Sequence, residues 1–336
     1  MQKEIGSEFW DVPINKEQNT IFPKHAQWFI SGRSALKSII KDIMVYKPNT
    51  VAMPSWCCDS MVKPFVRAGI NVRFYPVYWE KRLIQEPDYN QDVLFLMDYF
   101  GYTEPLPDIT GYQGVVIRDI THSVFSTTYT DADYCFGSLR KWCGVWTGGY
   151  AWANDRHSLL IGDSDINSYT ELRMQAMQLK GSYISGNGVT DKEYLSIFEK
   201  AEAALDDTNI DPAAKRDVFL ARHLDVAFIR KRRRKNAVVL RESFPDWLVF
   251  PKLKDDDCPM FVPVLVPDGK RDDLHRYLIR NGIYCPVHWP INKHHKLDNR
   301  ERYLYDNELS LVCDQRYTKE DMMRIVETIH SFLEEV

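Results

Sequence analysis

Two hydrophobic periodicities alternate along the first 155 residues. Segments with helical spacing, Arg33–Val45 and then Trp56–Ala68 up to Gly69, separate short apolar runs. These runs are rich in β-branched and aromatic residues, which is typical of strands buried on both faces. The runs are Ala26–Ile30, Thr50–Met53, Val72–Val77, Val93–Met97, Val115–Ile117, Tyr134–Phe136 and Tyr150–Ala153. Strands alternating with helices predict an α/β fold with a mostly parallel sheet covered by helices on both faces.

The pattern changes in the second half of the chain, where helical spacing dominates. The predicted helices are Asp165–Gln178, Asp191–Leu205, a long Ala213–Phe244, Lys270–Asn281 and Thr318–Leu333, and the predicted strands are Met260–Val266 and Tyr284–Val287. We therefore expect two domains. Residues 1–210 would form a large cofactor-binding domain with an N-terminal segment, and residues 211–336 a long linking helix and a small C-terminal α+β domain.

Composition excludes several classes of protein. The chain of 336 residues has a formal net charge of −4, which favours neither nucleic acid nor an anionic membrane. We find no run of 18 apolar residues and no apolar leader, so we expect neither a membrane span nor a signal peptide. The seven cysteines are scattered apart from Cys57-Cys58, which predicts reduced thiols in a cytoplasmic protein.

Two further motifs are interpreted as structural. The basic run Arg230–Lys235 lies between apolar residues of the predicted long helix, so we interpret it as a solvated helix face. His294-His295 lacks carboxylate or cysteine ligands at suitable spacing, and we expect a loop there and no metal site.

Candidate chemistry begins at the predicted strand that ends in Asp119. Polar residues at the carboxyl ends of parallel strands gather in active sites, and a buried carboxylate needs a partner such as a protonated pyridine nitrogen. The alternative is that Asp119 caps a turn. His122, three residues further on, would contact a cofactor or be a structural histidine.

The run DYCFGSLRKWCGVWTGG places Ser138 and Lys141 after another strand and before Gly148-Gly149. A lysine in a partly dry setting can hold an aldehyde cofactor as a Schiff base. The alternative is that Arg140 and Lys141 are two surface cations on a loop.

Near the N-terminus, Gly32, Arg33 and Ser34 follow a short strand and open a helix. Free N–H groups at a helix N-terminus can bind a phosphate, although an ordinary glycine turn would have the same sequence.

Taken together, five blocks resemble the DegT/DnrJ/EryC1/StrS aminotransferases, fold-type-I pyridoxal-phosphate enzymes of which many aminate nucleotide-linked keto-sugars in polysaccharide biosynthesis. The blocks are GRSAL (32–36), PSWCCDSMVKPFVRAG (54–69), RDITHS (118–123), SLRKWCGVWTGG (138–149) and LSLVCDQRY (309–317). The serine lies three residues before the lysine here, whereas the sugar aminotransferases usually place it five before. The chain is also shorter than many of them, so a divergent branch with a different substrate is open.

The resemblance implies roles for individual residues. Lys141 would carry pyridoxal 5′-phosphate as a Schiff base and move the substrate proton, Asp119 would pair with the pyridine nitrogen, and His122 would contact the cofactor. The phosphate would lie against Gly32, Arg33, Ser34 and Ser138. The aromatic residue that stacks on the ring would be Trp56 by its chemistry or Cys58 by alignment.

The resemblance also implies substrate and partner contacts. Arg316 is the candidate for the carboxylate of an amino donor such as glutamate, and His288 and Trp289 would face the same cleft. The active site would be shared across a homodimer, with Tyr183 or Asn187 of a glycine-broken loop over residues 180–188 reaching the partner's phosphate. A plain interhelical loop is the alternative.

Other functions remain open from the sequence. A pyridoxal-phosphate-binding relative could act as a dehydratase or another lyase, or as a silent regulator. Keto-sugar dehydratases of the resembling family typically replace the lysine with histidine, whereas this chain keeps Lys141. A nucleotide-binding α/β protein without this cofactor is a third possibility.

Overall fold

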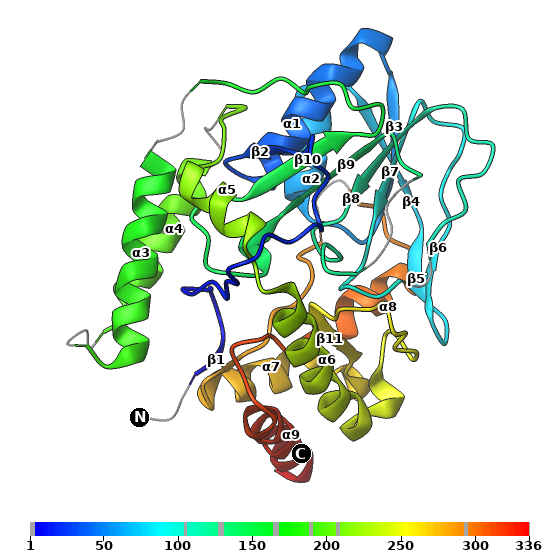
Figure 1. The fold of residues 1–336 in the computed structure, drawn as a ribbon. Helices are drawn as coiled ribbons and strands as arrows, with labels where there is room; N and C mark the ends of the chain where they lie inside the picture. Colours follow the sequence, from blue (N-terminus) through cyan, green and yellow to red (C-terminus); the bar gives the residue numbers. More distant parts are fainter. Residues whose placement is uncertain are drawn as a thin grey trace.

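A computed structural model describes residues 4–103, 106–126, 131–163, 168–187, 191–205, 209–291 and 295–335 (Figure 1). Its centre is a seven-stranded sheet with the order β2-β10-β9-β8-β7-β3-β4, in which only β10 is antiparallel to its neighbours. The strands are β2 (Gln27–Phe29), β3 (Thr50–Pro54), β4 (Asn71–Tyr75), β7 (Val93–Met97), β8 (Val115–Asp119), β9 (Tyr134–Ser138) and β10 (Gly149–Ala153). The predicted α/β fold with a mostly parallel sheet is confirmed.

Burial explains why these runs form strands. Every residue of β7, β9 and β10 is buried, as expected for strands covered on both faces. Helix α1 (Gly32–Ile43) packs against β2, β9 and β10, and α2 (Asp59–Arg67) packs against α1. Helix α2 begins later than the predicted Trp56, because Cys58 is extended and occupies the N-cap position. A hairpin of β5 (Val77–Trp79) and β6 (Leu83–Gln85) follows β4.

Helices α3 (Ser168–Ser185) and α4 (Tyr194–Leu205) pack on each other beside the sheet (Figure 1). The predicted loop over residues 180–188 is wrong for its first part, since Lys180–Ser185 is the last part of α3. Gly181 lies inside this helix. A Cβ at this position would lie 3.7 Å from the Trp10 ring, which is an ordinary van der Waals distance. Gly188 lies outside the described residues.

Most of the remaining elements lie below the sheet in Figure 1, around a second hydrophobic cluster, whereas α5 lies beside the sheet. Ala221 of α5 and Leu304 and Tyr305 of α8 belong to the hydrophobic core of the sheet. An antiparallel pair, β11 with β13, packs with α6, α7 and α9. The elements are α5 (Lys215–Arg222), α6 (Val226–Ser243), β11 (Phe261–Leu265), α7 (Arg271–Arg280), β12 (Ile283–Tyr284), α8 (Asn299–Asn307), β13 (Glu308–Val312) and α9 (Lys319–Glu335). A domain boundary near residue 210 stays a prediction.

The predicted single helix Ala213–Phe244 is wrong, because the chain forms two helices. Asp225 caps α6 by accepting a hydrogen bond from the Phe228 N–H at 2.9 Å, and the preceding Leu224 bridges to Ile14. The predicted strand Tyr284–Val287 also shrinks to Ile283–Tyr284, which pairs with β1 (Ile5–Gly6). Pro286 has no N–H with which to continue the ladder.

The interpretation of the basic run as a solvated face holds for only part of it, since Lys231 and Lys235 are exposed but several of the arginines bind other parts of the protein. Arg233 is buried and donates to Gln315 Oε1 at 2.7 Å and to the Met260 carbonyl at 2.8 Å. Arg230 donates to the Phe125 carbonyl, and Arg234 to the Asp257 carbonyl. These arginines donate hydrogen bonds to backbone carbonyls that are distant in sequence. Helical periodicity alone cannot predict such partners.

None of the helices in the described part of the chain has the length and apolar composition that crossing a bilayer requires.

Candidate active site

The candidate site lies where β8 and β9 end. Because these neighbouring strands are parallel, with Asp119 opposite Phe136, their carboxyl ends bring Asp119 close to Ser138 and Lys141. Lys141 closes a short 3₁₀ turn, η2 (Leu139–Lys141), directly after β9. The structure therefore brings together the residues that the sequence predicted at two strand ends.

The Asp119 carboxylate is buried, and burial raises its pKa to about 6. The Thr121 N–H donates to Asp119 Oδ1 at 2.8 Å, which opposes this shift together with the Lys141 charge. The carboxylate therefore caps the following turn, as the alternative interpretation holds. The same group lies within electrostatic reach of Lys141, so the cap does not exclude a role in the site.

His122 is buried beside Asp119 in the turn after β8. Burial lowers its pKa to about 3, with a further contribution from Lys141, so the imidazole is neutral. Its Nδ1 has no hydrogen-bond partner among the described residues. The Trp289 ring lies nearly parallel to the imidazole, with centroids 5.7 Å apart. A buried polar atom left unpaired in this way is unusual and indicates a ligand position.

Gly32 and Ser138 meet at the N-terminus of α1. A Cβ on Gly32 would lie 3.3 Å from Ser138 Cβ, so only glycine fits there without displacement. Ser138 Oγ is buried and has no hydrogen-bond partner among the described residues. Ser31 caps α1 by accepting from the Ser34 N–H, and Ser34 Oγ donates to the Asn209 carbonyl at 2.7 Å. Gly32 and Ser138 therefore form a small polar cradle, whereas the Ser34 hydroxyl is already engaged.

Two arginines converge on Glu202 of α4. Arg33 forms an ion pair with Glu202, and Arg140 Nη1 lies 3.2 Å from the other carboxylate oxygen. Partial desolvation opposes ionisation of Glu202, whose side chain is half exposed, but Arg140, Arg33 and Lys141 lower its pKa to about 2. No local sequence pattern pointed to Glu202, because its partners lie on distant elements. Arg140 is thus largely buried and ion-paired, rather than a surface cation.

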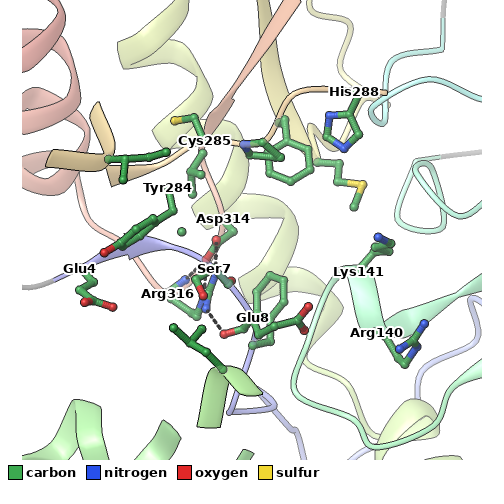
Figure 2. Close-up of a pocket in the computed structure, with 18 of the residues that line it drawn as sticks. Glu4, Ser7, Glu8, Arg140, Lys141, Tyr284, Cys285, His288, Asp314 and Arg316 are labelled. Atoms are coloured by element: carbon green, nitrogen blue, oxygen red, sulfur yellow. Dashed lines mark hydrogen bonds and ion pairs between the residues drawn. The ribbon is translucent and has the colours of Figure 1, made fainter. Parts of the chain in front are cut away.

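Lys141 is exposed and lines a cavity of about 450 Å³. Figure 2 shows Lys141 and Arg140 on one side of the cavity, with Glu4, Tyr284 and Arg316 on the other. The walls therefore come from four regions, which are η2, the N-terminal segment, the start of α4 with Lys192 before it, and the small α+β part. A side-chain amine that opens into a cavity of this kind can reach a ligand.

Trp56 and Cys58 occupy different places. Trp56 is fully buried, stacks on Tyr99 with centroids 5.0 Å apart and donates from Nε1 to the His288 carbonyl at 2.8 Å. Cys58 lines a groove beside Arg33 at the start of α2. Neither is among the residues that line the cavity with Lys141. Which of them stacks on a cofactor ring stays a prediction.

His288 and Trp289 separate in the structure. His288 lines the cavity, whereas Trp289 lies against His122 and against the edge of Trp56. Of the two residues, His288 is the one that lines the cavity with Lys141, and contact of either residue with a substrate stays a prediction.

Arg316 also lines the cavity, but its guanidinium is engaged. Nε and Nη2 bind the two carboxylate oxygens of Asp314 at 2.9 and 2.8 Å, and Nη1 and Nη2 donate to the carbonyls of Glu8 and Ser7. A substrate carboxylate would have to displace Asp314. In this arrangement, Arg316 fastens the N-terminal segment.

Tyr183 and Asn187 lie at the end of α3. The Tyr183 ring contacts Tyr194, with centroids 5.5 Å apart, and Asn187 is exposed just after the helix. They do not line the cavity of this chain, and a contact with a partner subunit stays a prediction.

No family model and no curated protein matches the chain. Solved structures do match it in fold. The sugar aminotransferase CalS13 from Micromonospora echinospora is 16% identical, with a TM-score of 0.59 over 91% of this chain and 87% of that one. The Helicobacter pylori aminotransferase PseC, involved in the biosynthesis of pseudoaminic acid, is 15% identical, with a TM-score of 0.63 over 98% and 100%.

A third similar structure is the E. coli GDP-4-keto-6-deoxy-D-mannose-3-dehydratase with bound hydrated PLP. It is 14% identical, with a TM-score of 0.59 over 90% of this chain and 87% of that one. At such identities the likeness establishes the fold alone, which is the fold predicted from the sequence.

Proposed function

We propose that this chain is a pyridoxal-phosphate-dependent aminotransferase. It would aminate a keto-sugar, in nucleotide-linked form, with an amino acid donor such as glutamate. The observation that carries the proposal is the convergence of Asp119, His122, Ser138 and Lys141 at the ends of two adjacent parallel strands. The fold match to sugar aminotransferases supports it.

The residues present fit this cofactor. His122 Nδ1 and Ser138 Oγ are buried polar atoms without partners among the described residues, and Gly32 leaves space beside Ser138. A ligand with an aromatic ring and a phosphate would satisfy both atoms. Ser138, Gly32 and the N-terminus of α1 would hold the phosphate, with Arg33 and Arg140 supplying positive charge nearby.

Pyridoxal phosphate supplies an aldehyde that condenses with amines and a ring that accepts electrons. Lys141 would bind that aldehyde through its amine and, once released, would carry a proton between donor and acceptor atoms in the cavity. Asp119, whose raised pKa of about 6 still leaves it mostly ionised at neutral pH, would hold a proton on the pyridine nitrogen. The neutral imidazole of His122 would orient the ring without adding charge.

The assembly and setting of the enzyme are proposed on the same basis. We infer a cytoplasmic homodimer in which Tyr183 or Asn187 approaches the partner's phosphate, supported by the exposed position of Asn187 after α3. A shared site implies an interface of roughly 2,000 Å² or more, so sedimentation of the cofactor-bound protein should give a dimer.

A lyase is the alternative, because a dehydratase is among the structures of the same fold. The two reactions differ in what happens to the amino donor. A transaminase consumes L-glutamate and changes the cofactor absorption, whereas a dehydratase removes water from the sugar without a stoichiometric amine transfer.

The central test is covalent attachment of the cofactor. Purified protein mixed with pyridoxal phosphate should develop a visible absorption band, and borohydride should fix the cofactor to the peptide that contains Lys141. Lys141→Ala should lose this adduct completely and should lower turnover by at least about 10³-fold, because alanine offers no amine. Little core is removed, so the fold should persist.

Lys192→Ala is the matched control, since Lys192 lines the same cavity but its amine is paired with Glu4. It should keep the adduct. An adduct that survived in Lys141→Ala and mapped to another lysine would overturn the assignment, and wild-type protein without any cofactor band would overturn the proposed function.

A further inference from the structure

Three side chains near the cavity form one continuous hydrogen-bonded chain. Ser310 Oγ donates to Glu308 Oε1 at 2.5 Å, and His288 Nδ1 lies 2.9 Å from the same hydroxyl. Glu308 and Ser310 are two residues apart on β13 and are fully buried, so both side chains lie on one face of that strand. The chain leads from a buried carboxyl group to an imidazole in the cavity wall.

His288 is held in place by three hydrogen bonds to two separate parts of the chain, β13 and the segment after β3. Its backbone N–H donates to Glu308 Oε2 at 2.8 Å, its carbonyl accepts from Trp56 Nε1, and its ring is bound by Ser310. Because Ser310 holds Nδ1, Nε2 is the ring nitrogen left for a ligand. His288 and Lys141 both line the cavity, as Figure 2 shows.

The surroundings favour a neutral imidazole and a carboxyl group that titrates. Burial raises the pKa of Glu308 to about 8, opposed by its hydrogen bonds and by Arg271 of α7. Burial lowers the pKa of His288 well below its usual range, and His122 and Lys141 add to this effect. Cys285, whose thiol interacts electrostatically with Glu308, is a further titratable group beside the chain. A proton that enters at His288 is therefore more stable on Glu308 than on the imidazole.

We propose that Glu308, Ser310 and His288 form a proton relay for the reaction in the cavity beside Lys141. The inference rests on the proposed function and adds a second acid–base group to it. His288 is the catalytic residue, since its Nε2 would touch the substrate, and Ser310 and Glu308 act through it.

The relay balances atom by atom. When an amine adds to a ketone, a C–N bond forms and the C–O bond breaks, and the oxygen leaves as water. The attacking amine supplies one of the two protons that this oxygen gains, and the relay supplies the other as negative charge develops on the oxygen. The Nε2–H bond breaks and an O–H bond forms on the substrate. The Ser310 hydroxyl proton moves to Nδ1, and the Glu308 carboxyl proton moves to Ser310 Oγ. Glu308 becomes a carboxylate, His288 stays neutral, and the reverse reaction restores the proton.

The relay can be tested in cofactor-free protein through the tautomer of His288. Above the pKa of Glu308, Ser310 donates to the carboxylate and His288 carries its proton on Nδ1. Below that pKa, the proton should lie on Nε2. In wild-type protein, ¹⁵N NMR of labelled histidine, assigned with His288→Gln, should therefore show a change of tautomer near pH 8 without formation of the imidazolium. A single tautomer at all pH values would overturn the relay.

Ser310→Ala should uncouple the two ends, so that the tautomer of His288 no longer changes with pH. Ser310→Thr, which keeps the hydroxyl, should restore the change. The control is Ser38→Ala, which removes another buried hydroxyl hydrogen bond, from Ser38 to the Leu160 carbonyl, far from the cavity. A change of tautomer that persists in Ser310→Ala would overturn the relay.

The kinetic arm uses cofactor-loaded protein with L-glutamate and 2-oxoglutarate as probes. Ser310→Ala and Glu308→Gln should slow both half-reactions by about 10²-fold, with cofactor affinity unchanged. Ser310→Thr should recover most of the rate, and Ser38→Ala should match wild type. Unchanged rates in Ser310→Ala would show that the reaction does not use the relay. Failure of wild type to bind the cofactor would instead count against the proposed function, while the NMR result still decides the relay.

Discussion

Two groups of buried polar side chains flank Lys141, and they differ in how fully their hydrogen bonds are satisfied. At the ends of β8 and β9, His122 Nδ1 and Ser138 Oγ have no partners among the described residues. At the junction with the N-terminal segment, Arg316 binds Asp314 through two parallel hydrogen bonds and also reaches two backbone carbonyls.

This difference suggests that the Arg316–Asp314 cluster is structural and that the His122–Ser138 cluster is a candidate ligand site. An unpaired buried polar atom costs about 1–3 kcal/mol, so a protein retains it where something binds. A saturated ion pair is complete without a ligand and fixes one segment on another. Buried polar groups with satisfied hydrogen bonds and buried polar groups without partners therefore suggest different roles.

The largest expected effect is at the saturated cluster. Arg316→Ala leaves the buried Asp314 carboxylate unpaired and releases the N-terminal segment, so the free energy of unfolding should fall by about 3–5 kcal/mol. Urea denaturation would measure this change. Arg276→Ala is the control, because Arg276 forms an exposed pair with Asp273 and should change stability by less than about 1 kcal/mol. A raised KM for L-glutamate without loss of stability would restore the substrate role predicted for Arg316.

The next effect is at the unsatisfied cluster. Asp119→Asn keeps the shape of the side chain but cannot hold a proton on the pyridine nitrogen, so the half-reaction with L-glutamate should slow by about 10²–10³-fold. Stopped-flow absorbance of the cofactor-loaded variant would measure the rate. An unchanged rate would mean that Asp119 serves only as the turn cap.

The same substitution has a separate effect on the cofactor-free protein. Because folding raises the pKa of Asp119 to about 6, the folded state holds its proton more tightly, and stability falls as pH rises from about 4 to above 6. Asparagine removes this penalty. Asp119→Asn should therefore stabilise the cofactor-free protein at pH 8, by at most about 3 kcal/mol, and less so at pH 5.

The smallest effect tests the cradle. In Gly32→Ala the new Cβ would lie 3.3 Å from Ser138 Cβ, so the cradle must widen by a few tenths of an ångström. Cofactor affinity should fall about tenfold, equivalent to about 1.4 kcal/mol, as measured by fluorescence titration. Gly181→Ala is the control, since its Cβ would meet only the Trp10 ring at 3.7 Å, and it should leave affinity unchanged.

Local patterns predicted the sheet and the main site because the relevant signals are short-range. The strands that end at Asp119 and Ser138 are continuous buried runs, and parallel pairing then places their ends together. The structure also answers one alternative in part, since Asp119 both caps a turn and lies within electrostatic reach of Lys141.

Long-range partners could not be predicted in this way. Arg316 is saturated partly by Ser7 and Glu8, which lie some 300 residues away in sequence, and Glu202 reaches Arg33 from another helix. The break between α5 and α6 depends on the Asp225 cap, which competes with an otherwise continuous helical pattern. The relay through Glu308 and Ser310 likewise requires His288 to lie opposite β13.

The pairing of β1 with β12 has a consequence for how the chain is made. Ile5 leaves the ribosome early, but its ladder partner Ile283 follows 278 residues later (283 − 5), and the Tyr317 hydroxyl that binds Gly6 later still. At about 5–20 residues per second, the first strand waits roughly 14–56 s for its place. During that time the backbone groups of Ile5 and Gly6 lack their ladder partner, although Arg173 and Lys180 are already available to bind Glu8 and Ser7.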